Sequence, residues 1–176
     1  MSRTRYKIYE DEYPYLITSS VIYGLPLFGS PRLSDIIINA LKFLQNKREA
    51  KIYAYVIMEN HIHFIAQANC LDRKIAAFKS YTARKCIDCL KNNDKHIWLR
   101  RLCEQKSKFK TDRKYQFWDE GYHPKQIIGD YMMVQKVEYI HNNPVKRGYV
   151  DSPEDWRYSS AKNYLGESGL FEVTIF

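Results

Sequence analysis

The 176-residue sequence predicts an α+β fold, a ferredoxin-like β-α-β-β-α-β sandwich in which helices pack on an antiparallel sheet. Two kinds of segment carry this prediction, and they alternate in this order along the chain. Segments rich in β-branched and aromatic residues favour strands, and longer segments with apolar residues at helical spacing favour amphipathic helices. We expect a single domain over residues 1–176, with its core at about 15–150 and a carboxy-terminal extension over 151–176.

The first strand and the first helix are bounded by turn and capping residues. Residues 15–23 are rich in β-forming side chains, and Gly24 and Pro26 stop the strand. Ser30 then provides an N-cap, and Pro31 suits the first helical position. We expect this helix to run to the basic pair at 47–48, with an apolar stripe made of Leu33, Ile36, Ile37, Ala40, Leu41 and Leu44.

The middle of the sequence predicts a β-hairpin followed by helices. Strands over 51–58 and 61–68 are separated by a turn at Glu59 and Asn60. A helix is expected from 71 to about 90, and a further helical segment at 97–102. The apolar stripe of the longer helix is Ile75, Phe78, Ala83, Ile87 and Leu90.

The last third predicts a short fourth strand over 115–122 and a helix over 128–143. Pro144 should end that helix by disfavouring helical geometry at Asn143. The expected apolar positions of this helix are Met132, Val134, Val137 and Ile140, and Tyr131 is expected to pack. Residues 170–176 alternate like a strand that adds to a sheet edge or to a partner subunit.

Composition favours some partners and excludes others. The formal net charge of +8 favours a polyanionic partner. No apolar run approaches the roughly 20 residues that span a bilayer, and residues 1–7 lack the apolar segment of a signal peptide. We therefore expect a cytoplasmic protein without a membrane partner.

The four cysteines raise the question of a zinc site. Cys86 and Cys89 form a C-x-x-C pair, but they lie in a predicted helix without the turn residues of a zinc knuckle. Cys70 and Cys103 follow no regular spacing. The sequence favours reduced structural thiols, as is usual in the cytosol.

Two histidines stand one residue apart in an apolar strand. Because successive strand side chains point to opposite faces, His61 and His63 project to the same side and Ile62 to the other. Two neutral imidazoles that converge in this way form half of a metal site. The alternative is that both histidines only line a half-buried surface.

A tyrosine flanked by two carboxamides lies on the last predicted helix. Gln135, Tyr139 and Asn143 are four residues apart and share one helical face. Tyrosine is a weak nucleophile, but a divalent metal that polarises a phosphate lowers the barrier to its attack on phosphorus. The alternative is a helix face of ordinary polar residues.

Taken together, these segments resemble the REP-associated tyrosine transposases, which are single-tyrosine HUH transposases. Residues 53–63 are similar to the family's apolar strand, Met, turn and His-hydrophobic-His motif. Residues 139–148 are similar to its Tyr-Ile-x-x-Asn-Pro-Val-x-x-Gly signature. Further matches lie at 117–123 and 155–160, so that the resemblance covers roughly 15–164 in the family's order.

The resemblance implies an enzyme that cleaves and joins single-stranded, REP-like hairpin DNA. It implies that His61 and His63 bind a divalent ion and that Tyr139 attacks the scissile phosphate. The product is a 5′-phosphotyrosine link with a free 3′-hydroxyl. A third metal ligand one helical turn beyond the nucleophile maps onto Asn143.

The ligand types indicate the metal. Two imidazoles and an amide oxygen leave open positions for phosphate and water, which suits Mn²⁺ and is acceptable to Mg²⁺. Glu59 either orients a ligand from behind or is an exposed turn residue.

Basic residues are the candidate DNA contacts. A segment over 100–114 is suited either to phosphate contact or to a solvated loop. Two further basic residues follow the tyrosine helix and either contact a phosphate or complement the helix dipole. The candidates are Arg100, Arg101, Lys106, Lys108, Lys110, Arg113, Lys114, Lys146 and Arg147.

Two other functions stay open at this point. A ferredoxin-like sheet with aromatic residues also serves non-catalytic binding of single-stranded nucleic acid, although the RNP1 pattern is missing from the sequence. A phosphodiesterase that activates water would need carboxylate ligands, which the sequence does not cluster. The sequence leaves both a monomer and a homodimer open.

Overall fold

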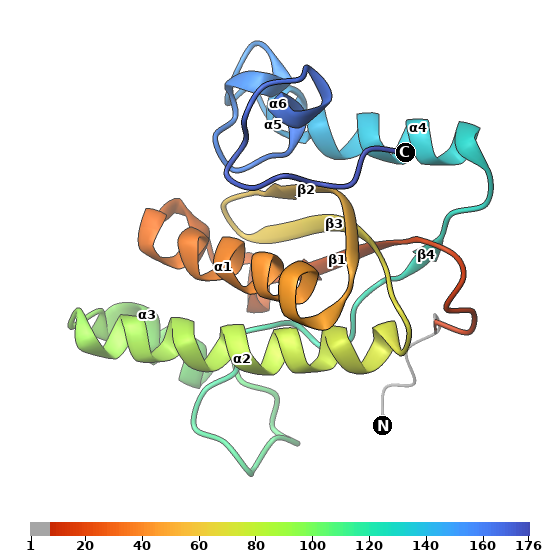
Figure 1. Ribbon diagram of the computed structural model, residues 1–176. Helices are drawn as coiled ribbons and strands as arrows, with labels where there is room; N and C mark the ends of the chain where they lie inside the picture. Colours follow the sequence, from red (N-terminus) through yellow and green to blue (C-terminus); the bar gives the residue numbers. More distant parts are fainter. Residues whose placement is uncertain (1–7) are drawn as a thin grey trace.

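The computed structural model describes residues 8–176 and contains a four-stranded antiparallel sheet (Figure 1). Its strands lie in the order β2-β3-β1-β4. Their bounds are β1 Tyr15–Ser20, β2 Lys51–Ile57, β3 His61–Gln67 and β4 Lys125–Gln126. The predicted α+β class and antiparallel sheet are confirmed. The expectation about a signal segment in residues 1–7 lies outside the described residues.

Helices cover both faces of the sheet, which gives three layers (Figure 1). Helices α1 and α2 lie on one face, with α3 beside α2, and α4 lies on the other. In residues 8–176, no helix is both long and apolar enough to cross a membrane. The helices are α1 Pro31–Arg48, α2 Leu71–Asn92, α3 His96–Glu104, α4 Asp130–His141, α5 Asn143–Lys146 and α6 Ala161–Tyr164.

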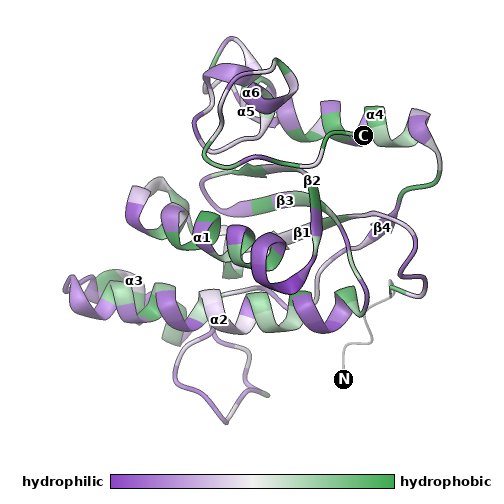
Figure 2. Cartoon of the chain, in the orientation of Figure 1, coloured by the Kyte–Doolittle hydropathy of each residue, from purple (hydrophilic) through white to green (hydrophobic). Residues whose placement is uncertain are grey.

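Strand alternation divides the apolar residues into two cores. On β3, Ile62, Phe64 and Ala66 belong to the core beneath α1 and α2, whereas Ile65 belongs to the core beneath α4. Figure 2 shows the apolar residues along the strands and on the helix sides that face them. His61 and His63, which alternate with Ile62 and Phe64, therefore share the α4 side of the sheet.

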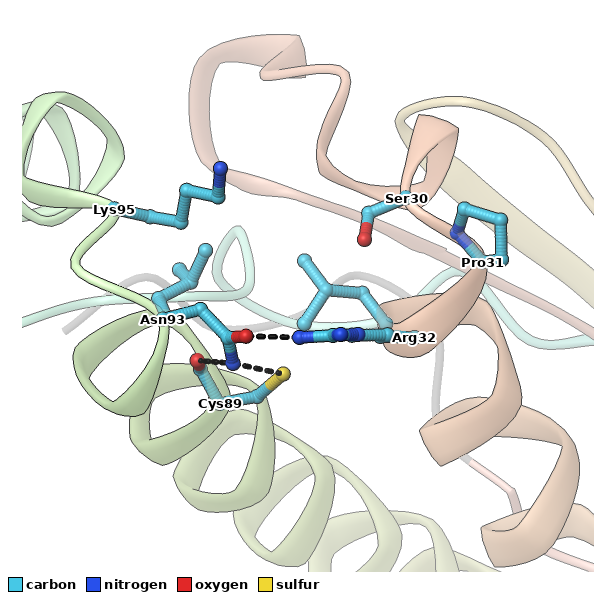
Figure 3. Close-up of a pocket in the computed structure, with 8 residues that line it drawn as sticks. Ser30, Pro31, Arg32, Cys89, Asn93 and Lys95 are labelled. Carbon is cyan, nitrogen blue, oxygen red and sulfur yellow. Dashed lines mark hydrogen bonds between the residues drawn. The ribbon is translucent and has the colours of Figure 1, made fainter.

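The first two long helices are joined where one begins and the other ends (Figure 3). Arg32 near the start of α1 donates a hydrogen bond to the side-chain oxygen of Asn93, just past α2. Asn93 in turn donates to the carbonyl oxygen of Cys89 at 2.8 Å. Cys86 lies fully buried one turn earlier, and burial raises the pKa of its thiol. The position of Cys86 in the core agrees with a structural thiol.

The fourth strand is shorter and later than predicted. Residues 115–122 form no strand, because Gly121 has a φ of 72° and turns the chain. Trp118 makes an isolated bridge with Val21, and Asp119 and His123 donate single backbone hydrogen bonds to β1. In this part of the chain, regular strand pairing with β1 is confined to β4.

The tyrosine helix also differs from the sequence prediction. Its buried positions are Met133, Val137, Ile140 and His141. Val134 is exposed, and Tyr131 is 78% exposed and does not pack. Pro144 breaks the helix after His141, but a new helix, α5, begins at Asn143. The steric preference of a residue before proline is thus overridden at Asn143, and the missing N–H of Pro144 costs no hydrogen bond because Pro144 lies in the first turn of α5.

The carboxy-terminal segment lies beside β2 without forming the predicted strand. Thr174 donates one backbone hydrogen bond to Ile52 at 2.8 Å. Phe171 stacks on Tyr55, with ring centroids 4.8 Å apart and an interplanar angle of 6°. Side-chain packing and one backbone hydrogen bond thus hold this segment at the edge of the sheet.

A buried polar contact joins α4, β2 and the segment after α5. The hydroxyl of Ser160 accepts a hydrogen bond from the backbone N–H of Tyr55 at 2.9 Å. Nε2 of His141 lies 2.8 Å from the same oxygen. Burial lowers the pKa of His141 to about 4, so the ring is neutral near pH 7. This contact fixes α4 relative to the sheet.

We expect Ser160→Ala to destabilise the fold. It leaves the Tyr55 N–H and the His141 ring without their partner in a buried place, which costs about 1–3 kcal/mol. Denaturant unfolding of both proteins measures this cost. Ser80→Ala on the exposed side of α2 is the control, expected within about 0.5 kcal/mol of the parent. Equal effects of the two substitutions would contradict the structural role of Ser160.

Candidate functional site

The two histidines of β3 lie together under α4. The centroids of the His61 and His63 rings are 4.8 Å apart, and their planes meet at 76°. His63 is only 5% exposed. Burial lowers the pKa of His63 to about 3, with His61 and Lys125 contributing. Burial also lowers the pKa of His61. Both rings are therefore neutral near pH 7, as metal ligands must be.

Each ring is held through its Nδ1 atom. Nδ1 of His61 lies 2.6 Å from the side-chain oxygen of Asn60, whose amide nitrogen donates to the carbonyl of Gly24. An amide oxygen only accepts, so Nδ1 of His61 carries the proton and Nε2 carries a free lone pair. Nδ1 of His63 lies 2.8 Å from the hydroxyl of Thr18, which can donate or accept.

The turn before β3 is fixed to the segment that follows β1. Val21 donates to the carbonyl of Asn60 and Phe28 to that of Glu59, both at 2.8 Å. Gly24 has a φ of 64°, and a Cβ at this position would lie 3.3 Å from the Asn60 amide nitrogen. Both observations favour glycine there. The start of β3 is thus held in place from two directions.

Tyr139 on α4 lies against the histidine pair. Its ring centroid is 5.4 Å from that of His63, with an interplanar angle of 66°. The Tyr139 side chain is 40% exposed, so a ligand can reach it. Nζ of Lys146 lies 5.8 Å from the centroid of the Tyr139 ring. A phenol, a cation and two imidazoles from β3, α4 and α5 therefore meet on one side of the sheet.

Asn143 stands one turn beyond Tyr139, as the spacing predicts. Its amide nitrogen donates to the carbonyl oxygen of Tyr139 at 2.6 Å. Within residues 8–176, the structure gives the side-chain oxygen of Asn143 no hydrogen bond, so this oxygen is available to a ligand. Gln135, the third residue of the predicted face, is exposed to solvent.

Glu59 and Arg147 form a contact that neither sequence alternative for Glu59 anticipated. The guanidinium of Arg147 lies 3.2 Å from one oxygen of the Glu59 carboxylate. The Glu59 side chain is only 22% exposed. Glu59 is therefore not an exposed turn residue; it pairs with Arg147, and its charge opposes the lowering of the His61 pKa. It joins the turn before β3 to the end of α5.

The nine predicted DNA-contacting residues fall into two groups. Lys146 lies next to Tyr139, and Arg147, just past α5, lies near enough to His61 to affect its pKa. The others are on α3 and in the loop over 105–114, on the α2 side of the sheet (Figure 1). Three of these make ion pairs with neighbouring carboxylates, namely Arg100 with Glu104, Lys110 with Glu120 and Arg113 with Asp112. The two groups are separate in the sequence, but no local pattern indicated that they would lie on opposite sides of the sheet.

The donor types at the site are compatible with a divalent cation. Two neutral imidazoles and one amide oxygen, from His61, His63 and Asn143, leave coordination positions open for phosphate and water. No cluster of three or more His, Cys, Asp or Glu side chains suited to a metal is found in residues 8–176. The candidate site has only two side chains of these four types, because its third ligand is an asparagine.

Thr18, Asn60 and Glu59 are the contacts that sequence reasoning missed or left open. Thr18 pairs with His63 across β1 and β3, and the run of hydroxyl residues in the second half of β1 was the available signal. Asn60 directly precedes His61 in the sequence. The partner of Glu59 is 88 residues away, so no local pattern could have indicated it.

The fold and this site define an α+β domain in which a histidine pair on a central strand faces a tyrosine on a covering helix. No family model matches the chain. A curated protein of Haemophilus influenzae, provisionally named a REP-associated tyrosine transposase, is 31% identical over 119 residues. The match covers 61% of this chain and 56% of that protein, so it spans little more than half of the relative's length.

One solved structure shares the fold of this chain. A REP-associated tyrosine transposase bound to a REP hairpin aligns with a TM-score of 0.69 and 18% identity, over 100% of this chain and 95% of that one. A provisionally named transposase of Deinococcus radiodurans aligns at a TM-score of 0.46 and 15% identity, over 81% of this chain and 97% of that one. The resemblance to REP-associated tyrosine transposases that the motifs indicated is confirmed.

We expect the His61 ring to carry its proton on Nδ1. Long-range proton–nitrogen NMR correlations report the tautomer, and they should show Nε2 without a proton in the parent protein. Asn60→Ala removes the acceptor and should give a mixture of both tautomers. The exposed His96 serves as an internal control that should not change. A proton on Nε2 of His61 in the parent protein would contradict the assignment.

Proposed function

We propose that this protein cleaves and rejoins single-stranded hairpin DNA through a covalent link to Tyr139. The observation that carries the proposal is the contact between the Tyr139 and His63 rings, which come from a covering helix and a central strand. Its support is that the chain resembles transposases in sequence and fold. A phosphodiester that bridges the phenol and the imidazole pair fits this arrangement.

The proposed reaction is a transesterification. The phenolic oxygen of Tyr139 forms a bond to phosphorus, and the bond between phosphorus and the 3′-oxygen breaks. The phenol loses its proton, and the departing 3′-oxygen gains one. The products are a 5′-phosphotyrosine and a 3′-hydroxyl, and a 3′-hydroxyl of another end can reverse the step and join two strands. Bond energy is conserved, so no external energy source is needed.

The residues that would hold a divalent cation, Mg²⁺ or Mn²⁺, are His61, His63 and Asn143. Such an ion polarises a phosphate oxygen and offsets the charge that develops on it. Asn60 and Thr18 hold Nδ1 of the two imidazoles and so orient the rings; for His61 the contact with Asn60 also leaves the lone pair on Nε2. Residues that hydrogen-bond to a metal ligand in this way commonly raise the affinity for the metal.

The cations near Tyr139 take different roles. Lys146 lies over the phenol ring, where its ammonium group favours a phosphate bound beside Tyr139. Arg147 is already paired with Glu59, so it contacts DNA only if a phosphate competes with that carboxylate. Its established contact positions the end of α5 against the turn that precedes His61.

The proposed partner is a REP-like DNA hairpin with an unpaired flank, which the net charge of +8 favours. The solved relative was bound to a REP hairpin, and we extend that partner to this chain. The basic residues of α3 and of the loop over 105–114 are the proposed contacts on the α2 side. A cytoplasmic location and a monomer or homodimer complete the proposal.

We expect labelled hairpin DNA and Mn²⁺ to give a covalent protein–DNA adduct on a denaturing gel. Tyr139→Phe should abolish the adduct because it removes the attacking oxygen. Tyr131→Phe is the matched control, since this tyrosine lies on the same helix and is exposed, and it should leave the adduct unchanged. Binding without an adduct would favour a non-catalytic module, and cleavage without an adduct would favour a water-activating phosphodiesterase.

We expect His63→Ala to weaken Mn²⁺ binding by at least about tenfold, because an imidazole ligand is lost. Electron paramagnetic resonance of free Mn²⁺ measures this affinity in the presence of hairpin DNA. His96→Ala removes an exposed imidazole away from the site and should have no effect. Equal Mn²⁺ affinity of the two variants would exclude His63 as a ligand.

A further inference from the structure

A hollow of about 460 Å³ lies between α2 and the segment over 110–122. It is separate from the histidine and tyrosine site, because it opens on the α2 side of the sheet. Its volume is within the range of pockets that hold small ligands. We call it the α2 cleft.

The α2 cleft has an aromatic wall. Tyr115 and Tyr122 line it and are partly exposed, and Trp118 lines it from a buried position. Lys79 lies 5.9 Å from the centroid of the Trp118 ring. Partly exposed aromatic rings beside cations are the surface on which unpaired bases stack.

Cations and carboxylates line the same cleft. Lys79, Lys110 and Arg113 contribute three positive charges, and Asp119 and Glu120 two negative ones. Lys110 pairs with Glu120 at 3.4 Å and Arg113 with Asp112 at 2.6 Å, so a phosphate would compete with these carboxylates. Lys79 donates to the backbone oxygens of Asp119 and Gly121, which leaves one of its three donors. Burial, with Lys110 contributing, lowers the pKa of Lys79 to about 8, so an anion placed beside it would favour its charged form.

This mixture suits a whole nucleotide better than a bare phosphate backbone. A ring stacks on a base, an ammonium or guanidinium binds a phosphate, and a carboxylate accepts from a base amino group, such as that of cytosine. A surface that only neutralised phosphates would have little use for two carboxylates and three aromatic residues.

The wall of the α2 cleft also adjoins the strand next to the histidines. Asp119 donates its backbone N–H to Ser20 of β1 at 2.9 Å, and Ser20 is paired with His61 of β3. Neighbouring strands are about 4.8 Å apart, so this wall lies roughly two strand spacings from the histidine strand. A strand of DNA at Tyr139 can therefore continue around the β4 edge of the sheet to the α2 cleft.

We infer that the α2 cleft binds one unpaired nucleotide of single-stranded DNA, with its base against Tyr115 or Tyr122 and its phosphate near Lys110 and Arg113. The inference rests on the proposal that the chain acts on single-stranded DNA. It adds a second contact, which holds DNA without taking part in the chemistry at Tyr139.

The test is the affinity for a short fluorescein-labelled oligo(dC), measured by anisotropy with EDTA present. Tyr122→Ala should weaken binding about tenfold because a stacking surface is lost. Tyr122→Phe keeps the ring and should bind as the parent does. Tyr81→Ala removes an exposed tyrosine of α2 outside the cleft and should also bind as the parent does.

A second variant covers the case in which Tyr122→Ala fails to fold. The double variant Lys110→Glu and Arg113→Glu should weaken binding and reduce its salt dependence. Parent-like binding by the folded cleft variants would overturn the inference, as would equal competition by a blunt duplex. Because EDTA removes divalent ions, this assay succeeds or fails independently of the adduct assay.

Discussion

The packing of α4 on the sheet is the contact on which the candidate site depends. Met133, Val137 and Ile140 form one apolar core with strand residues of β1, β2 and β3. This packing leaves Tyr139, on an adjacent side of the same helix, against His63 at the margin of the core. The phenol thus combines access to solvent with a position fixed by buried neighbours. Without α4 on this face of the sheet, Tyr139 would not lie beside the histidines of β3.

The histidine and the tyrosine of this site differ in burial. Burial keeps His63 neutral, which preserves a lone pair for a cation. Tyr139, by contrast, remains open to a large substrate. The proposed chemistry needs a neutral imidazole and an accessible phenol together. The edge of the core provides both, because the buried His63 ring contacts the more exposed Tyr139 ring there. Thr18 and Asn60 supply the polar contacts that a buried imidazole needs for a fixed orientation.

Local patterns predicted most of the fold and the histidine pair. Period-two alternation correctly placed His61 and His63 on one face, and Pro31 correctly marked the start of α1. The fourth strand failed because a positive φ at Gly121 depends on the surrounding chain. Helical spacing alone could not tell whether Met133 or Val134 faces the sheet, since they lie four and three residues before Val137 and both spacings fit one helix face. The ion pair of Glu59 and Arg147 and the separation of basic residues are long-range outcomes that no window of sequence contains.

The attachment of the β2–β3 turn determines which part of the site can move. The turn receives backbone hydrogen bonds from Val21 and Phe28, and Gly24 fits closely against Asn60. Among the described residues, the turn makes one ion pair with the side that carries the tyrosine, between Glu59 and Arg147. If the proposed exchange between DNA ends requires the two sides of the site to move apart, the strand that carries the histidines is the side that stays in place. The short helix α5, which begins after the break at Asn142, would then be the part that moves, because His141 and the core side chains hold α4 to the sheet.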